Sequence, residues 1–386
     1  MSFDSVEQYF LSTPSPSWRT ARSEQITTFL HDQKKSGNCV AIVTSGGTTV
    51  PLERNTVRFL DNFSTGSRGA AAVEHLLKLG YAVIYLYRPG SIAPFARHFP
   101  NEFSNHLDLY FMKHLSIDEE PQYKVSLSLE NEELHHLVEK AVRPYQESVR
   151  NNNILALSFE TVDDYLFSLR LVSELVKPWR ERVLFYLSAA VSDFYIPNAE
   201  LTEHKMESST GSLKLELLPT PKMLGVLRNE WAPNAFFVSF KLETNWDRLL
   251  KKARLSVEKY GMHVVVANEL KSRYHEVLLV SKNEARRLIR PNEQTDIDAS
   301  LVDAVVSMHF KYIATHSVSF PSKMGAHVHK YSRFHAWKRR YTPTQIVALM
   351  TLVHDHQIEI AAVLLGGVLS ALLSFLPSTT NRISSR

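Results

Sequence analysis

The sequence predicts an α/β protein with a Rossmann-like, mostly parallel sheet and helices on both of its faces. Two observations support this class. First, the apolar runs 40–44 and 81–87 flank a helical stretch that begins near Ala70, which is the strand–helix–strand order of a βαβ unit. Second, short apolar runs recur along the chain between turn and helix signals, at 154–159, 183–187, 236–240 and 264–267. Uninterrupted hydrophobicity of this kind is typical of strands that are buried on both faces.

The segments before and between these strands carry their own signals. A helix is expected over residues 23–35, closed by Gly37. Residues 1–20 are expected to form a solvated lead-in, because prolines and serines punctuate them. Residues 129–146 have a helical pattern within an otherwise irregular excursion from the sheet.

The second half of the chain continues the alternation of helices and strands. Thr161 and Asp164 have the spacing of a capping box and predict the start of a helix. Leucines alternate with charged residues over 213–217, which predicts an edge strand that ends at Pro219. The remaining expected elements are a helix over 246–260, a strand over 276–280 and a helix over 296–315.

Composition and pattern divide the chain into three parts: a lead-in and helix (1–36), a main domain (37–316) and a basic and apolar C-terminal extension (317–386). Within the extension, residues 360–376 carry no charge and approach the length that crosses a bilayer. Three alternatives stay open: a tail anchor that contacts the membrane through residues 358–376, a helix packed on the protein, and an extension of little function.

The composition also limits the classes of function. The formal net charge of +4 is small and the basic residues are scattered, so nucleic-acid binding gains no support. Cys39 is the single cysteine, which excludes an intrachain disulfide and suits a reducing compartment. The first 20 residues lack the apolar run of a secretory signal. We therefore expect a cytoplasmic protein.

Two glycine-containing clusters lie in the first βα unit. Gly46 and Gly47 follow the first strand, where their main-chain N–H groups can approach a phosphate or a base. The second cluster precedes the next helix and combines small residues, hydroxyls and a cation: Asn62, Ser64, Thr65, Gly66, Ser67, Arg68 and Gly69. Such residues at a helix start favour an anion. An ordinary tight turn remains the alternative for the Gly46-Gly47 pair, but two such clusters in one βα unit favour joint use at a ligand.

A cation and a second polar cluster extend this candidate site. Arg58 suits a bidentate contact with phosphate or carboxylate, although a surface ion pair is the alternative. Asp193 follows the strand 183–187 at the carboxyl edge of the sheet, where it could accept a hydrogen bond from a ribose or base or hold Mg²⁺ through water. A helix or turn cap is the alternative. Lys241, Glu243 and Asn268 end the next two strands, and this arrangement is typical of a nucleotide site.

Several motifs in one order connect the chain to a known family: TSGGT, VRFLDNFSTGSRGA, YLSAAVSDFY, HKMESSTG, FVSFKLET and VVVANEL. Over residues 38–316 the sequence resembles phosphopantothenoylcysteine synthetase, also called phosphopantothenate–cysteine ligase, in its eukaryotic form. The resemblance implies a ligase of coenzyme A biosynthesis that joins 4′-phosphopantothenate to L-cysteine. The family's reaction passes through an acyl-nucleotidylate and consumes ATP or CTP with Mg²⁺.

The resemblance also assigns roles to individual residues. Lys205 matches the flap lysine that neutralises phosphates, and Asn62 matches the asparagine that holds the acyl intermediate. Arg58 matches an arginine that reaches the neighbour's phosphopantothenate in family dimers, so a homodimer joined through a flap and dimerisation excursion is implied. The positions that match nucleotide-binding residues are Gly46, Ser64, Gly66, Gly69, Ala189, Ala190, Asp193, Phe240 and Asn268. Mg²⁺ would be held mainly through the nucleotide phosphates.

The sequence departs from bacterial family members at three points. The flavin-dependent decarboxylase that is usually fused to them is absent, and Lys259-Tyr260-Gly261 stands where they place lysines before the last asparagine motif. The segments LDNFS and SFKLET resemble eukaryotic members, which use ATP, whereas bacterial members mostly use CTP.

The main competing hypothesis is an NAD(P)-dependent oxidoreductase on a Rossmann-type sheet. Against it, TSGGT is not GxGxxG, and the second strand ends at Tyr87-Arg88 without an acidic residue for a ribose hydroxyl. A binding module without catalytic activity is the third possibility.

Overall fold

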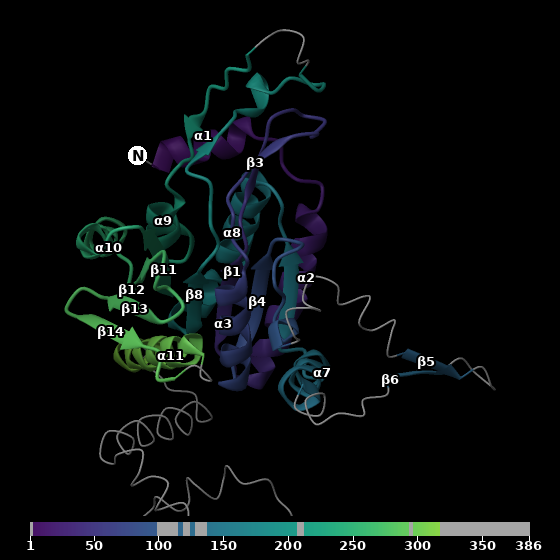
Figure 1. Ribbon diagram of the computed structural model, residues 1–386, viewed down its shortest axis with the longest axis vertical. Coiled ribbons are helices and arrows are strands. Elements are labelled where there is room, and N and C mark those ends of the chain that lie inside the picture. The colour runs from purple at the N-terminus through teal and green to yellow at the C-terminus, as the bar shows by residue number, and fades with distance from the viewer. Residues whose placement is uncertain are drawn as a thin grey trace, which may run out of the picture. The chain divides into compact units, whose positions relative to one another are not determined.

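Six parallel strands form most of an eight-stranded sheet, at the centre of the molecule in Figure 1. The computed structural model describes residues 3–98, 115–118, 124–127, 137–206, 212–292 and 296–316. In chain order, the parallel strands are β1 (Val40–Ser45), β4 (Ala82–Tyr87), β7 (Ile154–Ser158), β8 (Val183–Leu187), β11 (Phe236–Glu243) and β12 (Val264–Glu269). Two antiparallel strands, β13 (Glu276–Val280) and β14 (Ala285–Ile289), complete one edge.

The order of the strands is β14-β13-β12-β11-β8-β1-β4-β7. From β1 the chain first adds β4 and β7 on one side, then returns to the other side of β1 to add β8, β11 and β12. The direction of winding therefore reverses between β1 and β8. Ligands of open α/β sheets bind outside the carboxyl ends of the strands at such a reversal.

Helices cover both faces of the sheet (Figure 1). The helices on one face are α2 (Arg19–Ser36), α8 (Val162–Val176), α9 (Met223–Val226) and α10 (Trp246–Tyr260). The helices on the other face are α3 (Ser67–Lys78) and α11 (Ile297–His316), which pack against each other. Side chains alternate between the two faces of each strand. In β1, Val40 and Ile42 join the core under α2 and α8.

Smaller elements surround this framework. A hairpin of β2 (Thr49–Pro51) and β3 (Phe59–Asp61) and the short ladder of β9 (Phe194–Tyr195) with β10 (Leu218–Pro219) project beyond the sheet. The other small elements are the hairpin β5 (Leu115–Asp118) and β6 (Lys124–Leu127), helix α7 (Arg143–Arg150), the π-turns Val138–Val142 and Leu227–Trp231, and the 3₁₀ turns Ala96–His98, Lys177–Arg182 and Asn198–Glu200.

Most elements expected from the sequence are confirmed. The strand 183–187 and the helix 246–260 have the expected bounds, and Gly37 closes α2 with φ 73°. Thr161 and Asp164 form the expected capping box at the start of α8. The edge strand expected over 213–217 is wrong, because the ladder includes only Leu218 and Pro219.

The solvated lead-in expected over residues 1–20 is also wrong in part. Residues Phe3–Ser12 form helix α1, in which Val6 and Tyr9 are buried. The Tyr9 hydroxyl donates to the carboxylate of Asp163, and its ring packs edge-on against Tyr195. Val6 and Tyr9, three residues apart on one side of the short helix, thus supply the apolar contact that holds it on the main core.

The expectations for residues 317–386, including the possible membrane segment, lie outside the described residues. The proposed domain boundaries stay predictions, although α1 and α2 belong to the same compact unit as the sheet. Within the described ranges, no helix combines the length and the hydropathy needed to span a bilayer.

Two histidines, one fully buried and one partly buried, make stability depend on pH. His309 is 0% exposed; its Nε2 donates to the carbonyl of Glu181, so its Nδ1 accepts from the hydroxyl of Tyr81. Burial lowers the pKa of His309 to about 4, and burial together with nearby Arg228 lowers that of His263 to about 3. Both rings are therefore neutral in the folded protein at pH values where unfolded histidine is charged.

We expect the free energy of unfolding to fall as the pH decreases below the unfolded histidine pKa of about 6.5. Each buried ring should contribute a loss of about 2 kcal/mol between about pH 7.5 and about pH 5, because the unfolded state takes up the proton. Urea unfolding of His309→Gln, which keeps a donor and an acceptor, should show a shallower pH dependence than wild type. His31→Gln, at an exposed histidine, should retain the wild-type slope. Equal slopes for all three proteins would contradict the assignment.

Candidate functional site

The loops after β1 and β8 are joined at the reversal of the strand order. Ala190 N–H donates to the carbonyl of Gly46 at 2.8 Å, and Thr48 N–H donates to the carbonyl of Ala190 at 3.0 Å. Ala189 N–H also donates to Thr44 Oγ1 at 3.1 Å. The backbone around Gly46, Ala189 and Ala190 is therefore fixed before any ligand arrives.

The two glycine clusters meet at the same place. Gly46 has φ 88°, and a Cβ on it would lie 2.6 Å from Ser91 Oγ. Gly66 has φ 77°, and a Cβ there would lie 2.8 Å from Ser91 Cβ. In addition, Ser45 Oγ donates to the carbonyl of Gly66 at 2.9 Å. The structure thus confirms that the Gly46 and Gly66 turns form one cradle, which we call the glycine cradle.

The glycine cradle opens at the start of α3. Gly66 is the N-cap of this helix and provides no side-chain cap, while its own N–H lies 3.4 Å from Ser64 Oγ. Gly69 lies in the first turn, where a Cβ would overlap the side chain of Ser45 and lie 3.2 Å from Ser188 Oγ. Main-chain N–H groups at such a helix start, with its positive dipole end, suit a phosphate group.

The closeness of Gly69 to Ser45 gives a direct test of this packing. Gly69→Ala is expected to lower the free energy of unfolding by about 1–3 kcal/mol, because the added methyl group would clash with the side chain of Ser45. Urea denaturation measures the change. Gly225→Ala is the matched control, since no atom lies within 4 Å of its Cβ position. A Gly69→Ala protein as stable as this control would show that Ser45 moves aside at no cost.

Asn62 lies beside the glycine cradle in the hairpin. Its N–H donates to the carbonyl of Thr48 at 3.1 Å, and its own carbonyl occupies the space that a Cβ on Gly47 would need. The side chain of Asn62 is half-buried. The hairpin therefore approaches the loop after β1 closely only because residue 47 is glycine.

Phe240 and Asn268 lie further along the same edge of the sheet, at the ends of β11 and β12. The ring of Phe240 packs edge-on against Tyr186 with ring centres 4.9 Å apart. Asn268 is 5% exposed, and its Oδ1 is buried without a hydrogen-bond partner among the described residues. With strands about 4.8 Å apart, Asn268 lies three strands, or about 14 Å, from β1. That span matches the length of a nucleotide better than that of a single phosphate.

Asp193 is at the expected edge but is exposed and already paired. Its carboxylate lies 2.8 Å from Lys222 Nζ, and its carbonyl accepts from Thr220 N–H at 2.9 Å. Glu243, at the end of β11, contacts Lys252 at 2.6 Å and Lys241 at 3.6 Å. Within the described part of the chain, no group of three or more His, Cys, Asp or Glu side chains could hold a metal ion.

Lys205 is exposed in the segment that pairs with the β2–β3 hairpin. Arg54 N–H donates to the carbonyl of Thr202 at 2.8 Å, and Asn55 N–H donates to that of Glu203 at 3.2 Å. We call the hairpin together with residues 191–206 and 212–219 the arm. Its main-chain bonds place Lys205 on the arm rather than in the glycine cradle.

Arg58 joins the two halves of the arm. Its Nη2 lies 2.6 Å from Glu53 Oε1 and donates to the carbonyl of Met206 at 2.9 Å. The Glu53 side chain is 0% exposed, whereas that of Arg58 is 37% exposed. The alternative that the sequence left open, an ion pair, is thus present, and its carboxylate is buried rather than at the surface.

Sequence reasoning missed two residues of the glycine cradle, Arg88 and Ser91. Arg88 Nη1 donates to the carbonyl of Gly47 at 3.4 Å and to the carboxylate of Asp61. Their position directly after β4, a strand that ends at the same edge, was the available signal. By contrast, Cys39 is buried as expected, and burial raises its pKa to about 12, which disfavours the thiolate form.

Comparison with known proteins agrees with this geometry. Residues 168–309 match a family model described as the DNA/pantothenate metabolism flavoprotein C-terminal domain. The chain is 45% identical over 275 residues to phosphopantothenate–cysteine ligase 2 of Oryza sativa subsp. japonica, covering 71% of this chain and 81% of that protein. It is 40% identical over 306 residues to phosphopantothenate–cysteine ligase of Homo sapiens, covering 78% and 96%. A solved structure of a Cab2 mutant in complex with phosphopantothenate-cysteine has 35% identity and a TM-score of 0.70, covering 80% of this chain and 99% of that one.

Proposed function

Because this chain belongs to the phosphopantothenate–cysteine ligase family, we propose that it joins 4′-phosphopantothenate to L-cysteine in coenzyme A biosynthesis. The pantothenate carboxylate attacks the α-phosphorus of a nucleoside triphosphate, and pyrophosphate leaves. The cysteine amine then attacks the acyl carbonyl of the resulting acyl-nucleotidylate, and the nucleoside monophosphate leaves with the electron pair of the broken C–O bond. The products are phosphopantothenoylcysteine, pyrophosphate and the monophosphate.

The observation that carries this proposal is the glycine cradle at the reversal of the strand order. Gly46 and Gly66 both pack on Ser91, and the start of α3 opens beside them. Two anionic reactants repel each other, so the reaction needs fixed N–H donors and nearby cations. A preformed cradle, with Phe240 two strands (about 10 Å) and Asn268 three strands (about 14 Å) from β1 along the same edge, suits a nucleotide that lies across the strand ends.

We assign the remaining residues by their match to the family. Lys205 closes over the triphosphate and neutralises charge as pyrophosphate leaves. Asn62 donates its amide to the acyl carbonyl oxygen while negative charge grows there. Gly46, Ser64, Gly66, Gly69, Ala189, Ala190, Asp193, Phe240 and Asn268 surround the nucleotide.

The nucleotide is proposed to be ATP rather than CTP, because LDNFS and SFKLET resemble the eukaryotic members. Mg²⁺ is proposed to arrive with the triphosphate and to neutralise part of its charge. Asp193 and Glu243 are carboxylates at this edge, and their pairing with Lys222 and Lys252 leaves them poorly suited to hold the ion directly. We further propose that the reaction takes place in the cytoplasm.

The decisive experiment supplies the purified protein with phosphopantothenate, cysteine, Mg²⁺ and either ATP or CTP. Pyrophosphate and phosphopantothenoylcysteine should form in equal amounts, faster with ATP. Omission of cysteine should stop product formation. Absence of pyrophosphate with both nucleotides would contradict the proposal, and a change in nicotinamide absorbance with NAD(P)H would favour the oxidoreductase instead.

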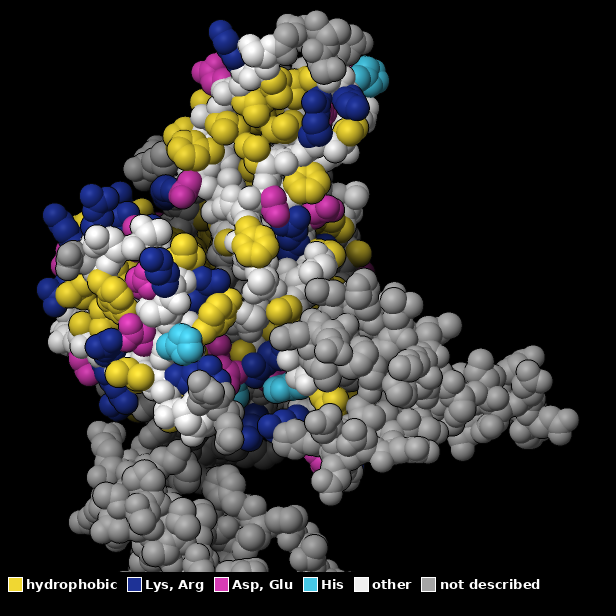
Figure 2. All heavy atoms as spheres, viewed as in Figure 1, with side chains coloured by type: hydrophobic (Ala, Val, Ile, Leu, Met, Phe, Trp, Pro, Cys, Tyr) yellow, Lys and Arg dark blue, Asp and Glu magenta, His cyan; other side chains and the backbone are white. Residues whose placement is uncertain are grey.

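The protein is also proposed to act as a homodimer joined through the arm. Hydrophobic side chains gather over the arm (Figure 2). The exposed large hydrophobic residues there are Val57, Phe59, Leu60, Phe63, Phe194, Leu213, Leu215 and Leu218. A cluster of this kind marks an interaction surface. The family resemblance favours a second copy as its occupant, with Arg58 reaching the neighbour's phosphopantothenate.

Light scattering tests the dimer. The wild-type mass should be twice that of the chain, and Phe59→Asp with Leu218→Asp should give the monomer mass. Leu255→Asp is the matched control, because Leu255 is at least as exposed as Phe59 and Leu218 but lies on α10. A wild-type monomer that is fully active would contradict the proposed assembly.

A further inference from the structure

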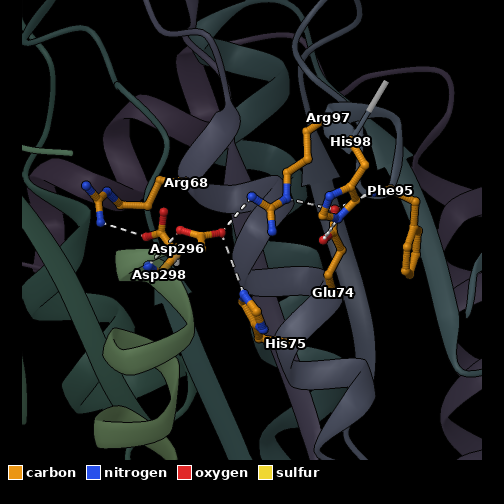
Figure 3. A network of polar contacts seen from close by, with 8 residues as sticks. All are labelled: Arg68, Glu74, His75, Phe95, Arg97, His98, Asp296 and Asp298. Atoms are coloured by element: carbon orange, nitrogen blue, oxygen red, sulfur yellow. Dashed lines mark hydrogen bonds and ion pairs between the residues drawn. The ribbon is translucent and has the colours of Figure 1, made fainter. Parts of the chain in front are cut away.

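Arg68 lies in the second glycine cluster, yet its side chain is directed away from the solvent. It is the second residue of α3, and its side chain is only 13% exposed. Figure 3 shows it turned toward the first turn of α11. A phosphate-binding arginine would be expected to present its donors to the ligand, so the position of this one calls for another role.

The guanidinium of Arg68 joins three separate elements. Its Nη1 donates to Asp298 Oδ1 at 2.7 Å, and its Nη2 donates to the carbonyl of Arg273 at 2.7 Å. Its central carbon also lies 6.0 Å from the centre of the Phe240 ring. Asp298 belongs to α11, Arg273 to the turn after β12, and Phe240 to β11. Of these three elements, β11 contains the proposed nucleotide position Phe240. The turn with Arg273 directly follows β12, which contains the other position, Asn268.

Asp298 is itself buried and depends on Arg68. Burial raises the pKa of Asp298 to about 6, and the charge of Arg68 opposes this rise. Without the guanidinium, a nearly buried carboxylate would lose a hydrogen-bond donor and the largest of the positive charges that act on it, with Arg97 and His75 acting more weakly. The pair is therefore a strong restraint between α3 and α11.

A second buried arginine in the same network lacks this connection. Arg97 contacts Glu74 at 2.9 Å and Asp296 at 2.6 Å, so it ties the 3₁₀ turn Ala96–His98 to α3 and α11 (Figure 3). Its described hydrogen bonds go only to these two carboxylates. Like Arg68, Arg97 is largely buried and pairs with carboxylates, here Glu74 and Asp296 rather than Asp298, but it lacks the contacts with β11 and the turn after β12.

We propose that Arg68 is a positioning residue for the nucleotide: it ties the first turn of α3 to the turn after β12 and thereby fixes the glycine cradle relative to Phe240 and Asn268. This inference rests on the proposed function, since it requires a nucleotide that spans both ends of the edge. Arginine suits the role because its planar group donates to two acceptors in different directions at once, whereas lysine offers a single point of charge.

Nucleotide KM and affinity test the proposal. Arg68→Met should raise the KM for ATP about 10- to 100-fold, because displacement of one end by about an ångström spoils the alignment. Arg68→Lys should give an intermediate value, since it keeps the charge but loses one contact. The KM for cysteine should change by less than about threefold in both variants. Calorimetric Kd values for ATP should follow the KM values.

Arg97→Met is the matched control. It should lower Tm while the KM and Kd for ATP remain those of wild type. The proposal is overturned if Arg97→Met weakens ATP binding as much as Arg68→Met, or if a folded Arg68→Lys protein binds ATP like wild type. Calorimetry needs no turnover, so a wild type that binds ATP but forms no product contradicts only the proposed reaction. A wild type that binds no ATP overturns both.

Discussion

Replacing Lys205 with alanine is expected to slow nucleotide turnover by about 2–4 kcal/mol in barrier, or roughly 30- to 1,000-fold in rate. The lysine is exposed on the arm, in a segment that Thr202 and Glu203 tie to the hairpin by main-chain hydrogen bonds. An ammonium group brought by this segment to the triphosphate would stabilise charge that develops as pyrophosphate leaves. Its removal should therefore affect the activation step.

Steady-state pyrophosphate release measures this loss. Lys214→Ala is the matched control, because Lys214 is an exposed lysine on the same arm that matches no family motif. It should turn over ATP at the wild-type rate. If Lys205→Ala does the same, the lysine stays in solvent during the reaction and the flap assignment fails.

For Asn62→Ala, we expect activation to survive while amide formation slows by about 10²–10³-fold, the typical loss of one oxyanion donor. The backbone of Asn62 is fixed by Thr48 and by its close approach to Gly47, so the side chain can be removed without releasing the hairpin. The variant should accumulate the acyl-nucleotidylate. Rapid-quench measurements should show a burst of about one pyrophosphate per site before slow product formation.

Asn55→Ala provides the control, since Asn55 lies in the same hairpin and its structural contact is made by its main-chain N–H. It should show no burst and normal product formation. If Asn62→Ala shows no burst, and pyrophosphate and product appear together at the same slow rate from the first turnover, the role is not confined to the second step.

The sequence was informative wherever a local pattern determines the structure. The uninterrupted apolar run from Val40 to Thr44 predicts a strand that is buried on both faces. The structure agrees, because helices cover both faces of this strand. Gly37, Thr161 and Asp164 are caps whose chemistry acts within four residues. Helix α1 was missed because its stability comes from Tyr9 and its contact with Asp163, 154 residues away.

The candidate site divides in the same way. The turns at Gly46 and Gly66 could be predicted because a glycine directly after a strand or before a helix is a local signal of positive φ. The contact of both with Ser91 depends on the pairing of β1 with β4, and that of Arg68 with Asp298 joins residues 230 positions apart. Reversal of the strand order between β1 and β8 likewise follows from the packing of whole elements, which no single segment of the chain specifies.

The Glu53–Arg58 pair affects how mutagenesis of the arm should be interpreted. Alanine at position 58 would leave the fully buried carboxylate of Glu53 without its ion-pair partner and would remove the hydrogen bond to Met206. Loss of activity in this variant could therefore come from a misfolded hairpin as well as from a lost substrate contact. Glu53→Gln removes the buried negative charge that Arg58 neutralises. Comparing Arg58→Gln in that background with Glu53→Gln alone therefore isolates what the guanidinium does for a neighbouring subunit.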